Sequence, residues 1–406
     1  MSFSITKSST ISSWEELLES ARQNTPARRV KRPGKSPSTA PIPSTLDKVP
    51  PDKKPPVLLY RDSNSWCPFC ERVWFALEEK GIPFETEFID LSNKPKWYTD
   101  LVPTTLVPAA YIEGKLVYES KKILLELEEH FGETLLPENT EENAVGREWV
   151  EDAETNGFRD IAYKLLRQAP ENANELAYLQ AECESKLDEI EKILGRYPGS
   201  YFLSTFSLVD IMYSPHLDRL AANLPVYRGY HIKGNPRFPQ INAWFTALKQ
   251  RPAYNRVKSD NITNNLLLRR RFGIEPIGNS IPLDLVESEF IEYRAEAAER
   301  LSDNREVAIE DILKNSGVQV LGDISIIKEG VDFHLRLLAD YLINGNGAPL
   351  PGGRTGGKES IDPIIAATGA ITLAYVRNRI CAPRDMSAGA ATAFRAAADK
   401  VLASIY

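Results

Sequence analysis

Residues 57–79 have the sequence VLLYRDSNSWCPFCERVWFALEE, in which an apolar run and a polar loop precede a Cys-x-x-Cys pair. The run from Val57 to Tyr60 predicts a short strand. The apolar spacing that follows Cys70 predicts a helix, which the glycine and proline just after residue 80 end. This order of strand, loop and helix predicts an α/β domain with Cys67 at the N-terminus of its first helix.

The position of Cys67 has a chemical meaning. Unpaired backbone N–H groups and the helix dipole at a helix N-terminus stabilise a thiolate, which is the reactive form of cysteine. Cys70 lies one turn further along, close enough to attack a mixed disulfide formed on Cys67. We therefore predict that Cys67 is a nucleophile and that Cys70 is a candidate resolving thiol.

Two other interpretations of the cysteine pair stay open. A structural or zinc-binding pair would want two more ligands at matching spacing, but Cys183 and Cys381 stand alone and none of the four histidines forms a second paired motif. The other interpretation is an iron–sulfur cluster bridged between two chains, which the visible spectrum of anaerobically purified protein tests. Thiol chemistry is favoured, and no metal site is predicted.

The segments after the first helix continue the α/β pattern. Residues 84–89 alternate like a strand, and residues 107–112 and 116–118 flank a Glu-Gly-Lys turn, which indicates a hairpin. Residues 119–131 have the apolar spacing of a helix. If the peptide bond before Pro108 is cis, the proline faces the cysteine turn and leaves the preceding backbone free to pair with a peptide-like ligand.

The rest of the chain is predicted to be mainly helical. Residues 139–256 show the apolar faces of successive helices, and Ser207 with Asp210 forms a capping motif at the start of one of them. Further helices are expected at 285–301, 331–343, 361–380 and 388–405.

Composition limits the classes of function. The 406 residues are 42% hydrophobic and 26% charged, which is typical of a globular chain of two or three domains, and the net charge of −7 argues against a chain-wide nucleic-acid binder. No apolar run of about 18 residues is present, so no transmembrane segment is expected. Four cysteines are too few for a secreted disulfide scaffold of this size, so a reducing compartment is expected.

The first 55 residues are basic, with ten Lys or Arg against five acidic residues. Ser12 with Glu15, or Ser13 with Glu16, offers a capping box for a short helix. A basic and Pro-rich stretch follows. The segment is either a docking arm for an acidic partner or membrane surface, or a solvated linker, and the linker is favoured.

Taken together, these motifs resemble the glutathione transferases over about residues 57–258. Residues 66–74 (WCPFCERVW) resemble the site of the cysteine-type classes, which are omega, lambda and dehydroascorbate-reductase-like. In family order, residues 93–97 look like the lysine segment of the glutathione site and residues 106–108 like its cis-proline motif. Residues 118–120 look like the element that binds the γ-glutamyl end, and residues 207–210 like the capping box of the helical domain.

The resemblance implies a fold and a site. The fold is an α/β thioredoxin-like N-terminal domain, an all-α glutathione-transferase C-terminal domain and an additional, mainly helical C-terminal module. The implied boundaries are 1–55 for the N-terminal extension and linker, 56–132 for the thioredoxin-like domain, 138–260 for the helical domain and 261–406 for the C-terminal extension. Cys67 is implied as the catalytic thiol with Cys70 beside it, and the implied glutathione contacts are Phe69, Lys94, Val107, Pro108, Glu119 and Ser120.

The chemistry of these residue types agrees with the implied roles. Ser120 opens a helix, so the N–H groups there can receive a carboxylate. Lys94 offers a positive charge for the glycyl carboxylate of glutathione, and its alternative role is that of a solvated surface lysine.

The length of the chain adds a second resemblance. Most transferases of this type end near the equivalent of residue 260, whereas this chain continues to residue 406. A Cys-x-x-Cys site with an N-terminal extension and a long helical C-terminal extension resembles the iota class of cyanobacteria, algae and some non-seed plants. That implies a photosynthetic source, with a location in the cytoplasm or, in a eukaryote, the plastid stroma. Because family members commonly dimerise, a homodimer is also an expectation.

Three features of residues 261–406 raise the question of a ligand. Residues 352–358 nearly match a phosphate-binding loop, but Glu359 replaces the required Ser or Thr, so a flexible loop is favoured. The helix at 361–376, rich in small apolar residues, could line a cavity for a flat or long ligand, although a packed helix is favoured. His334 could be an axial haem ligand, although a structural histidine is favoured.

Two functions of different classes follow. The first is a glutathione-dependent thiol transferase or reductase that works through a mixed disulfide between Cys67 and glutathione, with a small thiol or disulfide substrate and dehydroascorbate as a further candidate. Conjugation to electrophiles is disfavoured, because it needs Tyr or Ser where this chain has a cysteine. The second is a binding protein whose helical domains hold a photosynthetic pigment, a tetrapyrrole or another large apolar ligand. The absorption spectrum of protein from its native host tests the second.

Overall fold

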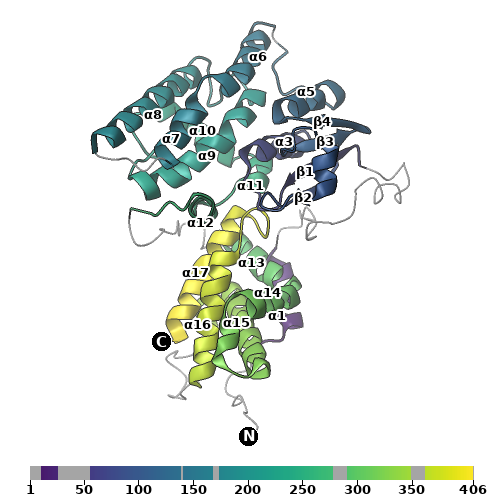
Figure 1. The fold of residues 1–406 in the computed structure, drawn as a ribbon, viewed down its shortest axis with the longest axis vertical. Coiled ribbons are helices and arrows are strands. Elements are labelled where there is room, and N and C mark those ends of the chain that lie inside the picture. The colour runs from purple at the N-terminus through teal and green to yellow at the C-terminus, as the bar shows by residue number, and fades with distance from the viewer. Residues whose placement is uncertain are drawn as a thin grey trace. The chain divides into compact units, whose positions relative to one another are not determined.

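The computed structural model describes residues 11–25, 55–138, 140–167, 173–277, 290–348 and 362–405. Contacts divide the chain into two compact units, one of residues 32–281 and the other joining residues 1–31 to residues 282–406. Figure 1 shows the elements of both units. The Pro-rich stretch after residue 25 and the phosphate-loop-like residues 352–358 lie outside the described residues.

The first unit begins with a four-stranded mixed sheet and three helices. The strand order is β2-β1-β3-β4, with β1 parallel to β2, and with β1–β3 and β3–β4 antiparallel. This is the predicted thioredoxin-like α/β domain, and its strands lie where the sequence pattern placed them, to within two residues. Its elements are β1 (Val57–Asp62), α3 (Pro68–Glu79), β2 (Phe84–Ile89), α4 (Lys96–Leu101), β3 (Ala109–Ile112), β4 (Lys115–Tyr118) and α5 (Ser120–His130).

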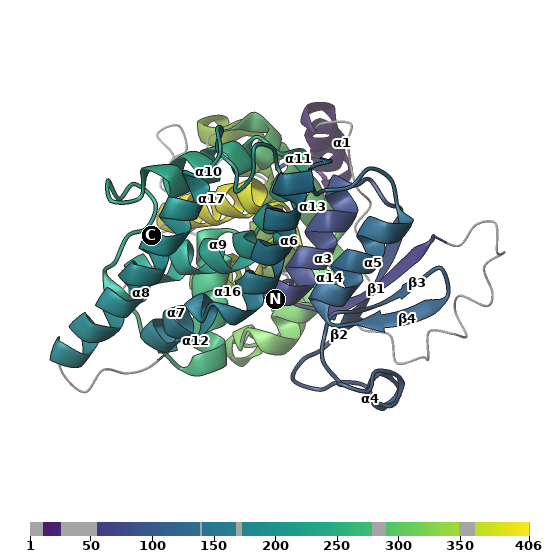
Figure 2. The same cartoon turned by 90° about the horizontal axis from the view of Figure 1, so that it is seen from above.

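The two faces of the sheet are covered by different helices. Successive side chains of a strand point to opposite faces. Val57 and Leu59 of β1 belong to the core formed with α3 and α5, whereas Leu58 and Tyr60 pack in a smaller core with Tyr98 of α4. Figure 2 shows α3 and α5 on one side of the sheet and α4 on the other. All six residues of β1 are therefore buried, as expected of a central strand covered on both faces.

The second part of this unit is all-helical, as predicted. Helix α9, most of whose residues are buried, contacts α3 of the thioredoxin-like domain as well as α6, α7 and α12. Its start is fixed by Asp210, which accepts bonds from the Ser207 N–H at 2.8 Å and from the indole N–H of Trp244 at 2.7 Å. The backbone bond predicted for the capping motif is thus confirmed. The helices are α6 (Thr140–Thr155), α7 (Phe158–Arg167), α8 (Ala173–Leu194), α9 (Leu208–Arg228), α10 (Pro239–Lys249), α11 (Pro252–Val257) and α12 (Asn261–Phe272).

Helix α12 belongs with these helices by its contacts. It packs against α9, where the Tyr227 hydroxyl donates to the Asn265 carbonyl at 2.7 Å. Asp260 caps it by accepting from the N–H groups of Ile262 and Thr263. Residues 261–272 therefore pack with the helices of the first unit, while the four domain boundaries expected from the sequence stay predictions.

The second unit is built from helices at both ends of the chain. Helices α14, η3 and η4 were not among the elements predicted from the sequence, whereas α13, α15, α16 and α17 overlap predicted helices. The elements are α1 (Trp14–Asn24), α13 (Ile291–Asp303), α14 (Arg305–Asn315), η3 (Val318–Leu321), α15 (Ile324–Asn344), η4 (Gly345–Gly347), α16 (Pro363–Arg379) and α17 (Ala388–Ile405).

Helix α1 packs against α13 and α15. It starts with the capping box of Ser13 and Glu16, one of the two predicted pairs. Trp14, Leu17 and Ala21 are buried in the core of the C-terminal helices, and the Trp14 indole N–H donates to Asp332 at 2.7 Å. The N-terminal helix therefore binds the acidic C-terminal module of its own chain, whereas the basic stretch of the proposed docking arm lies outside the described residues.

Helices α15 and α16 approach closely at two glycines. A Cβ at Gly369 would lie 2.2 Å from Nε2 of His334, and a Cβ at Gly330 would lie 3.0 Å from a methyl carbon of Thr368. The imidazole of His334 is fully buried, and its Nδ1 lies 2.7 Å from the Gly330 carbonyl oxygen. The His334 ring is thus packed closely between α15 and α16, and the choice between a ligand and a structural role stays a prediction.

Among the described residues, no helix has both the length and the apolar character needed to cross a membrane.

Candidate active site

The predicted site residues lie in segments that adjoin the ends of three strands. Ala109 at the start of β3 pairs with Tyr60 near the end of β1 and with Tyr118 at the end of β4. Cys67 follows β1, Pro108 precedes β3 and Glu119 follows β4. The sheet register therefore brings these three segments to one edge of the domain.

Cys67 is the N-cap residue of α3, with φ −66° and ψ 115°. Its side chain is 9% exposed, and its Sγ lies 4.0 Å from the carbonyl oxygen of Val107, to which the thiol can donate. Pro68 occupies the first helical position, where a missing N–H costs nothing. Cys67 therefore lies at the positive end of the α3 dipole, a position that suits a negatively charged group.

Cys70 lies one turn inside α3 and is 1% exposed. Burial raises the pKa of its thiol well above the ordinary value, and a hydrogen bond with Cys67 acts in the same direction. Cys70 therefore stays protonated near neutral pH and can serve as a donor to Cys67. Both thiols are free in the structure.

The loop before β3 lies beside Cys67 and is tied down by polar contacts. The Val107–Pro108 peptide bond is cis. The Tyr98 hydroxyl donates to the Leu106 carbonyl at 2.6 Å, and the Lys94 ammonium donates to the Thr105 carbonyl at 2.8 Å. These hydrogen bonds hold Lys94 and Val107 in one segment of the chain, and Lys94 is half-buried at the edge of that segment.

Glu119 and Ser120 form the start of α5. Glu119 is exposed and has φ 72°, a conformation that is uncommon outside glycine. Ser120 is the first helical residue and is buried. Lys122, one turn further on, forms an ion pair with Glu119 at 3.1 Å. The unpaired N–H groups at this helix start suit a carboxylate.

Phe69 lies on the side of Cys67 that faces the helical domain. Its ring packs edge-on against the imidazole of His216, with 5.5 Å between centroids. The guanidinium carbons of Arg72 and Arg159 lie 5.2 and 5.8 Å from the ring centroid of Phe69. Phe69 therefore contacts α7 and α9, and a role at glutathione stays a prediction.

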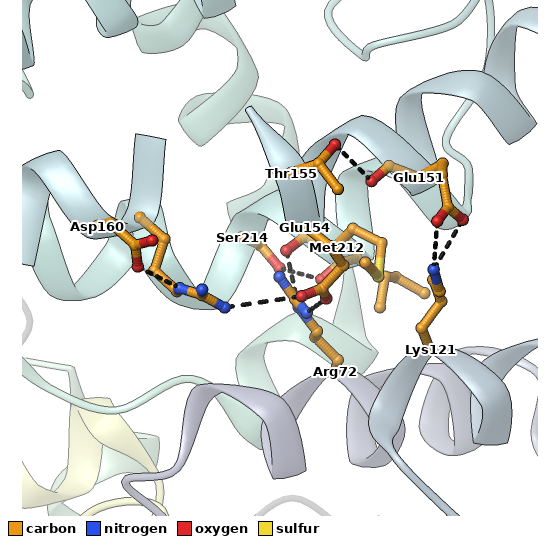
Figure 3. Close-up of polar contacts among 10 residues, drawn as sticks. Arg72, Lys121, Glu151, Glu154, Thr155, Asp160, Met212 and Ser214 are labelled. Atoms are coloured by element: carbon orange, nitrogen blue, oxygen red, sulfur yellow. Dashed lines mark hydrogen bonds and ion pairs between the residues drawn. The ribbon is translucent and has the colours of Figure 1, made fainter. Parts of the chain in front are cut away.

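Arg72 joins α3 to two helices of the second domain. Its side chain is 1% exposed, and its Nε donates to the Met212 carbonyl of α9 at 2.9 Å. The same guanidinium forms an ion pair with Glu154 of α6. Figure 3 shows Arg72 pointing toward both partners, and beside them the 2.7 Å ion pair between Lys121 of α5 and Glu151 of α6. These contacts hold the cysteine helix against the helical domain.

Three further residues near Cys67 were not predicted from the sequence. His216 of α9 is 3% exposed, and neither ring nitrogen has a hydrogen-bond partner among the described residues. Burial, with the charge of Arg72, holds the pKa of His216 well below its ordinary value, so the imidazole is neutral. The hydroxyl of Tyr163 is also buried without such a partner. These helical residues carry no motif, and only the fold brings them to the cysteine.

The third residue is Arg219 of α9, which forms a buried ion pair with Glu71 of α3 at 2.7 Å. Their side chains are 1% and 3% exposed. Burial raises the pKa of Glu71 from 4.5 to about 7, although the charge of Arg219 acts in the opposite direction. The folded protein therefore holds the Glu71 proton more tightly than the unfolded chain does.

This raised pKa predicts how stability changes with pH. The contribution of Glu71 is fully present below pH 4.5 and is lost as the pH rises through about 7. The wild type should therefore lose thermal stability relative to Glu71→Gln between pH 4.5 and 7, with the exposed Glu19→Gln as a control that follows the wild type. Midpoints from circular dichroism at several pH values measure the difference. If the wild type instead gains thermal stability relative to Glu71→Gln as the pH rises, the charge of Arg219 has a larger effect on the pKa of Glu71 than burial has.

The site can perform thiol–disulfide exchange. It combines a thiol at a helix N-terminus, a second thiol that is buried and protonated, and two buried guanidinium groups. Within the described ranges, no three His, Cys, Asp or Glu side chains gather into a group that could hold a metal ion. Fold and site together define a two-domain thiol protein with a thioredoxin-like first domain and a helical second domain.

Comparison with known proteins agrees with this class. The family description "Glutathione S-transferase, N-terminal domain" matches residues 66–130, and "Glutathione S-transferase, C-terminal domain" matches residues 147–247. The chain is 33% identical over 200 residues to Protein IN2-1 homolog A of Oryza sativa subsp. japonica, a match that covers 48% of this chain and 78% of the relative. It therefore belongs to the glutathione S-transferase family.

Two other relatives carry the family name. Glutathione S-transferase L1 of Arabidopsis thaliana is 30% identical over 201 residues, which cover 48% of this chain and 79% of the relative. Glutathione S-transferase omega-1 of Sus scrofa is 28% identical over 211 residues, which cover 50% of this chain and 82% of the relative. Each match accounts for about half of this chain.

Proposed function

We propose that this transferase is a glutathione-dependent thiol transferase that works through a mixed disulfide between Cys67 and glutathione. The place of Cys67 supports this most directly, since its thiol lies at the N-cap of α3 beside the Val107 carbonyl. A cysteine at this position forms a disulfide with glutathione, which a hydroxyl cannot do.

The proposed reaction has two exchange steps. The Cys67 thiolate attacks the glutathionyl sulfur of a substrate R–S–S–G, so a bond forms between Cys67 and glutathione, the substrate disulfide breaks, and R–S⁻ leaves and takes a proton from water. A glutathione thiolate then attacks the glutathionyl sulfur held on Cys67, which releases GSSG and restores the Cys67 thiolate. In sum, R–S–S–G and GSH give R–SH and GSSG, so that the substrate sulfur is reduced and glutathione is oxidised.

The geometry suggests how glutathione binds. We assign the cysteinyl part of glutathione to the Val107 backbone, whose carbonyl oxygen lies 4.0 Å from the Cys67 sulfur. The N–H groups at Glu119 and Ser120 suit the γ-glutamyl carboxylate. We assign the glycyl carboxylate to Lys94, whose ammonium donates one bond to the Thr105 carbonyl and has two further donors.

A comparison of two reactions of the wild-type protein tests the proposal. We expect glutathione-dependent reduction of a small mixed disulfide to be fast, with dehydroascorbate assayed as a second substrate. Conjugation of glutathione to an aryl halide should be slow, because that reaction needs Tyr or Ser at the position that Cys67 occupies, where a cysteine bonds to glutathione instead. Fast conjugation together with no disulfide reduction would overturn the proposal.

The class of glutathione transferase, the source and the cellular location of the protein are further proposals. Helix α1 and the C-terminal helices from α13 onward lie outside the residues that match the family descriptions. Together with the Cys-Pro-Phe-Cys site, they support the iota class, a photosynthetic source and a place in the cytoplasm or plastid stroma. A homodimer is proposed from family resemblance, and sedimentation at several protein concentrations tests it.

A further inference from the structure

The residue that precedes Cys67 is bound at both of its backbone groups. The Trp66 N–H donates to Oδ2 of Asp62 at 2.7 Å. The Trp66 carbonyl accepts two bonds from Arg219, from Nε at 2.9 Å and from Nη2 at 2.7 Å. Arg219 stands 153 positions later in the sequence. A side chain of the helical domain therefore holds the peptide group that leads directly into the cysteine.

Arg219 also reaches the residues that follow Cys67. Its Nη2 lies 2.7 Å from the carboxylate of Glu71, whose own backbone N–H donates to the Cys67 carbonyl at 3.1 Å. Its Nη1 donates to the Pro215 carbonyl at 2.8 Å and so stays anchored to α9. One guanidinium thus contacts the chain on both sides of Cys67 and uses all three of its nitrogen atoms.

The residue type matters for this arrangement. A guanidinium is planar and offers several donors in a fixed fork, so that it binds a carbonyl and a carboxylate at the same time and keeps its charge at every physiological pH. At 1% exposure this charge is poorly screened by water. A lysine ammonium would keep the charge but could not reproduce the two parallel bonds to one carbonyl.

Arg219 is one of two cations that act on the cysteine from inside the protein. The other is Arg72, which is bound to Glu154 and to the Met212 carbonyl rather than to the residues flanking Cys67. The ionisable groups with an electrostatic interaction with Cys67 include Cys70 and Arg72 of α3, Tyr98 of α4, Tyr163 of α7 and Arg219 of α9. Those that interact with these groups or with Glu71 and His216 include Asp62, Glu71, Glu154, Arg159, His216 and Asp218.

We propose that Arg219 is a positioning residue for Cys67, which holds the Trp66 carbonyl and Glu71 so that the thiol stays at the N-terminus of α3 with a fixed positive charge beside it. The proposal rests on Cys67 being the reactive thiol of the proposed function. It assigns to the helical domain a direct part in activating a residue of the thioredoxin-like domain.

The test measures the reactivity of Cys67 without glutathione. The rate at which iodoacetamide alkylates Cys67 is followed by mass spectrometry across a range of pH in the full-length protein, because only the thiolate reacts. In Arg219→Met we expect alkylation of Cys67 near neutral pH to slow about tenfold, because a buried positive charge that favours the reactive thiolate is removed. The alkylation rate of Arg219→Lys should lie between those of Arg219→Met and the wild type, because lysine keeps the positive charge but loses the paired hydrogen bonds of the guanidinium.

Arg228 provides a matched control on the same helix. Its guanidinium donates to the carbonyls of Leu165, Leu166 and Tyr227 at 2.6 to 2.7 Å, so it makes a comparable set of backbone bonds away from the cysteine. Arg228→Lys should lower the thermal midpoint while leaving the pH profile of Cys67 alkylation unchanged.

Two results would overturn the inference. One is a folded Arg219→Met or Arg219→Lys protein whose Cys67 alkylates with the wild-type pH profile. The other is failure of both variants to fold, as judged by circular dichroism, which would make Arg219 a structural residue only. Because alkylation needs no glutathione, a wild-type protein that alkylates normally but reduces no mixed disulfide counts against the proposed function and leaves this inference standing.

Discussion

Replacing Cys67 with serine is expected to slow glutathione-dependent disulfide reduction by a factor of about 1000 or more. The serine hydroxyl keeps the size and place of the thiol at the N-cap of α3, but it cannot form a disulfide with glutathione. The rate is measured with a small mixed disulfide and excess glutathione. Mass spectrometry of the wild type should show a glutathione adduct on the peptide that contains Cys67, and the variant should show none.

Cys70→Ser is expected to keep most of the activity. The two exchange steps need only one protein thiol, and Cys70 is 1% exposed with a pKa raised by burial, so it is a poor attacking group. Cys183→Ser is the control, because Cys183 is buried in α8 and takes no part in the site.

These variants separate three mechanisms. Equal loss of activity in Cys67→Ser and Cys70→Ser would replace the one-thiol cycle with a dithiol mechanism in which Cys70 resolves the mixed disulfide. Activity that survives in Cys67→Ser would show that the reactive group lies elsewhere in the chain.

Gly369→Ala is expected to destabilise the C-terminal module by about 3 kcal/mol or more, because overpacking a closed core forces backbone shifts. The new Cβ would lie 2.2 Å from Nε2 of His334 and 2.4 to 2.5 Å from two ring carbons. The imidazole is fully buried and is held by the Gly330 carbonyl, so it has little freedom to move aside. Hydrogen exchange in peptides from α15 and α16, together with thermal unfolding, measures the loss.

Gly347→Ala is the matched control in the same module. Gly347 is exposed in η4, and a Cβ there meets no atom within 4 Å. The double variant His334→Ala with Gly369→Ala should be less destabilised than the sum of its two single variants, because removing the ring makes room for the methyl group. If the amide hydrogens of α15 and α16 exchange as slowly in Gly369→Ala as in Gly347→Ala, the close approach of these two helices is wrong.

Local patterns predicted the thioredoxin-like domain well. The strand at residues 84–89, the hairpin around Gly114 and the helix at the cysteine pair all depend on signals within a few neighbouring positions, such as alternation, a turn residue or a proline at a helix start. The capping bond of Asp210 was predictable for the same reason. In each case the residues that determine the element lie inside it.

The contacts that complete the site could not be predicted in this way. Arg219 and Trp66 are 153 positions apart, and an arginine on a long helix is most often a surface residue. Helix α14 was missed because its apolar spacing is weak, with only Ile309 and Ile312 buried. Likewise, nothing near Trp14 indicates that its indole binds Asp332, which lies 318 positions away. Such pairs become visible only when the fold brings them together.

The shared core of α1 and the C-terminal helices has a consequence for synthesis on the ribosome. Trp14, Leu17 and Ala21 emerge early, but the start of α13, the first of the helices that bury them, follows about 280 residues later. At a translation rate of 5 to 20 residues per second, this delay is on the order of 15 to 60 seconds. During that time the apolar face of α1 has no C-terminal helix to pack against, and the intervening transferase domains can fold first. The first helix to be made is therefore among the last to reach its native contacts.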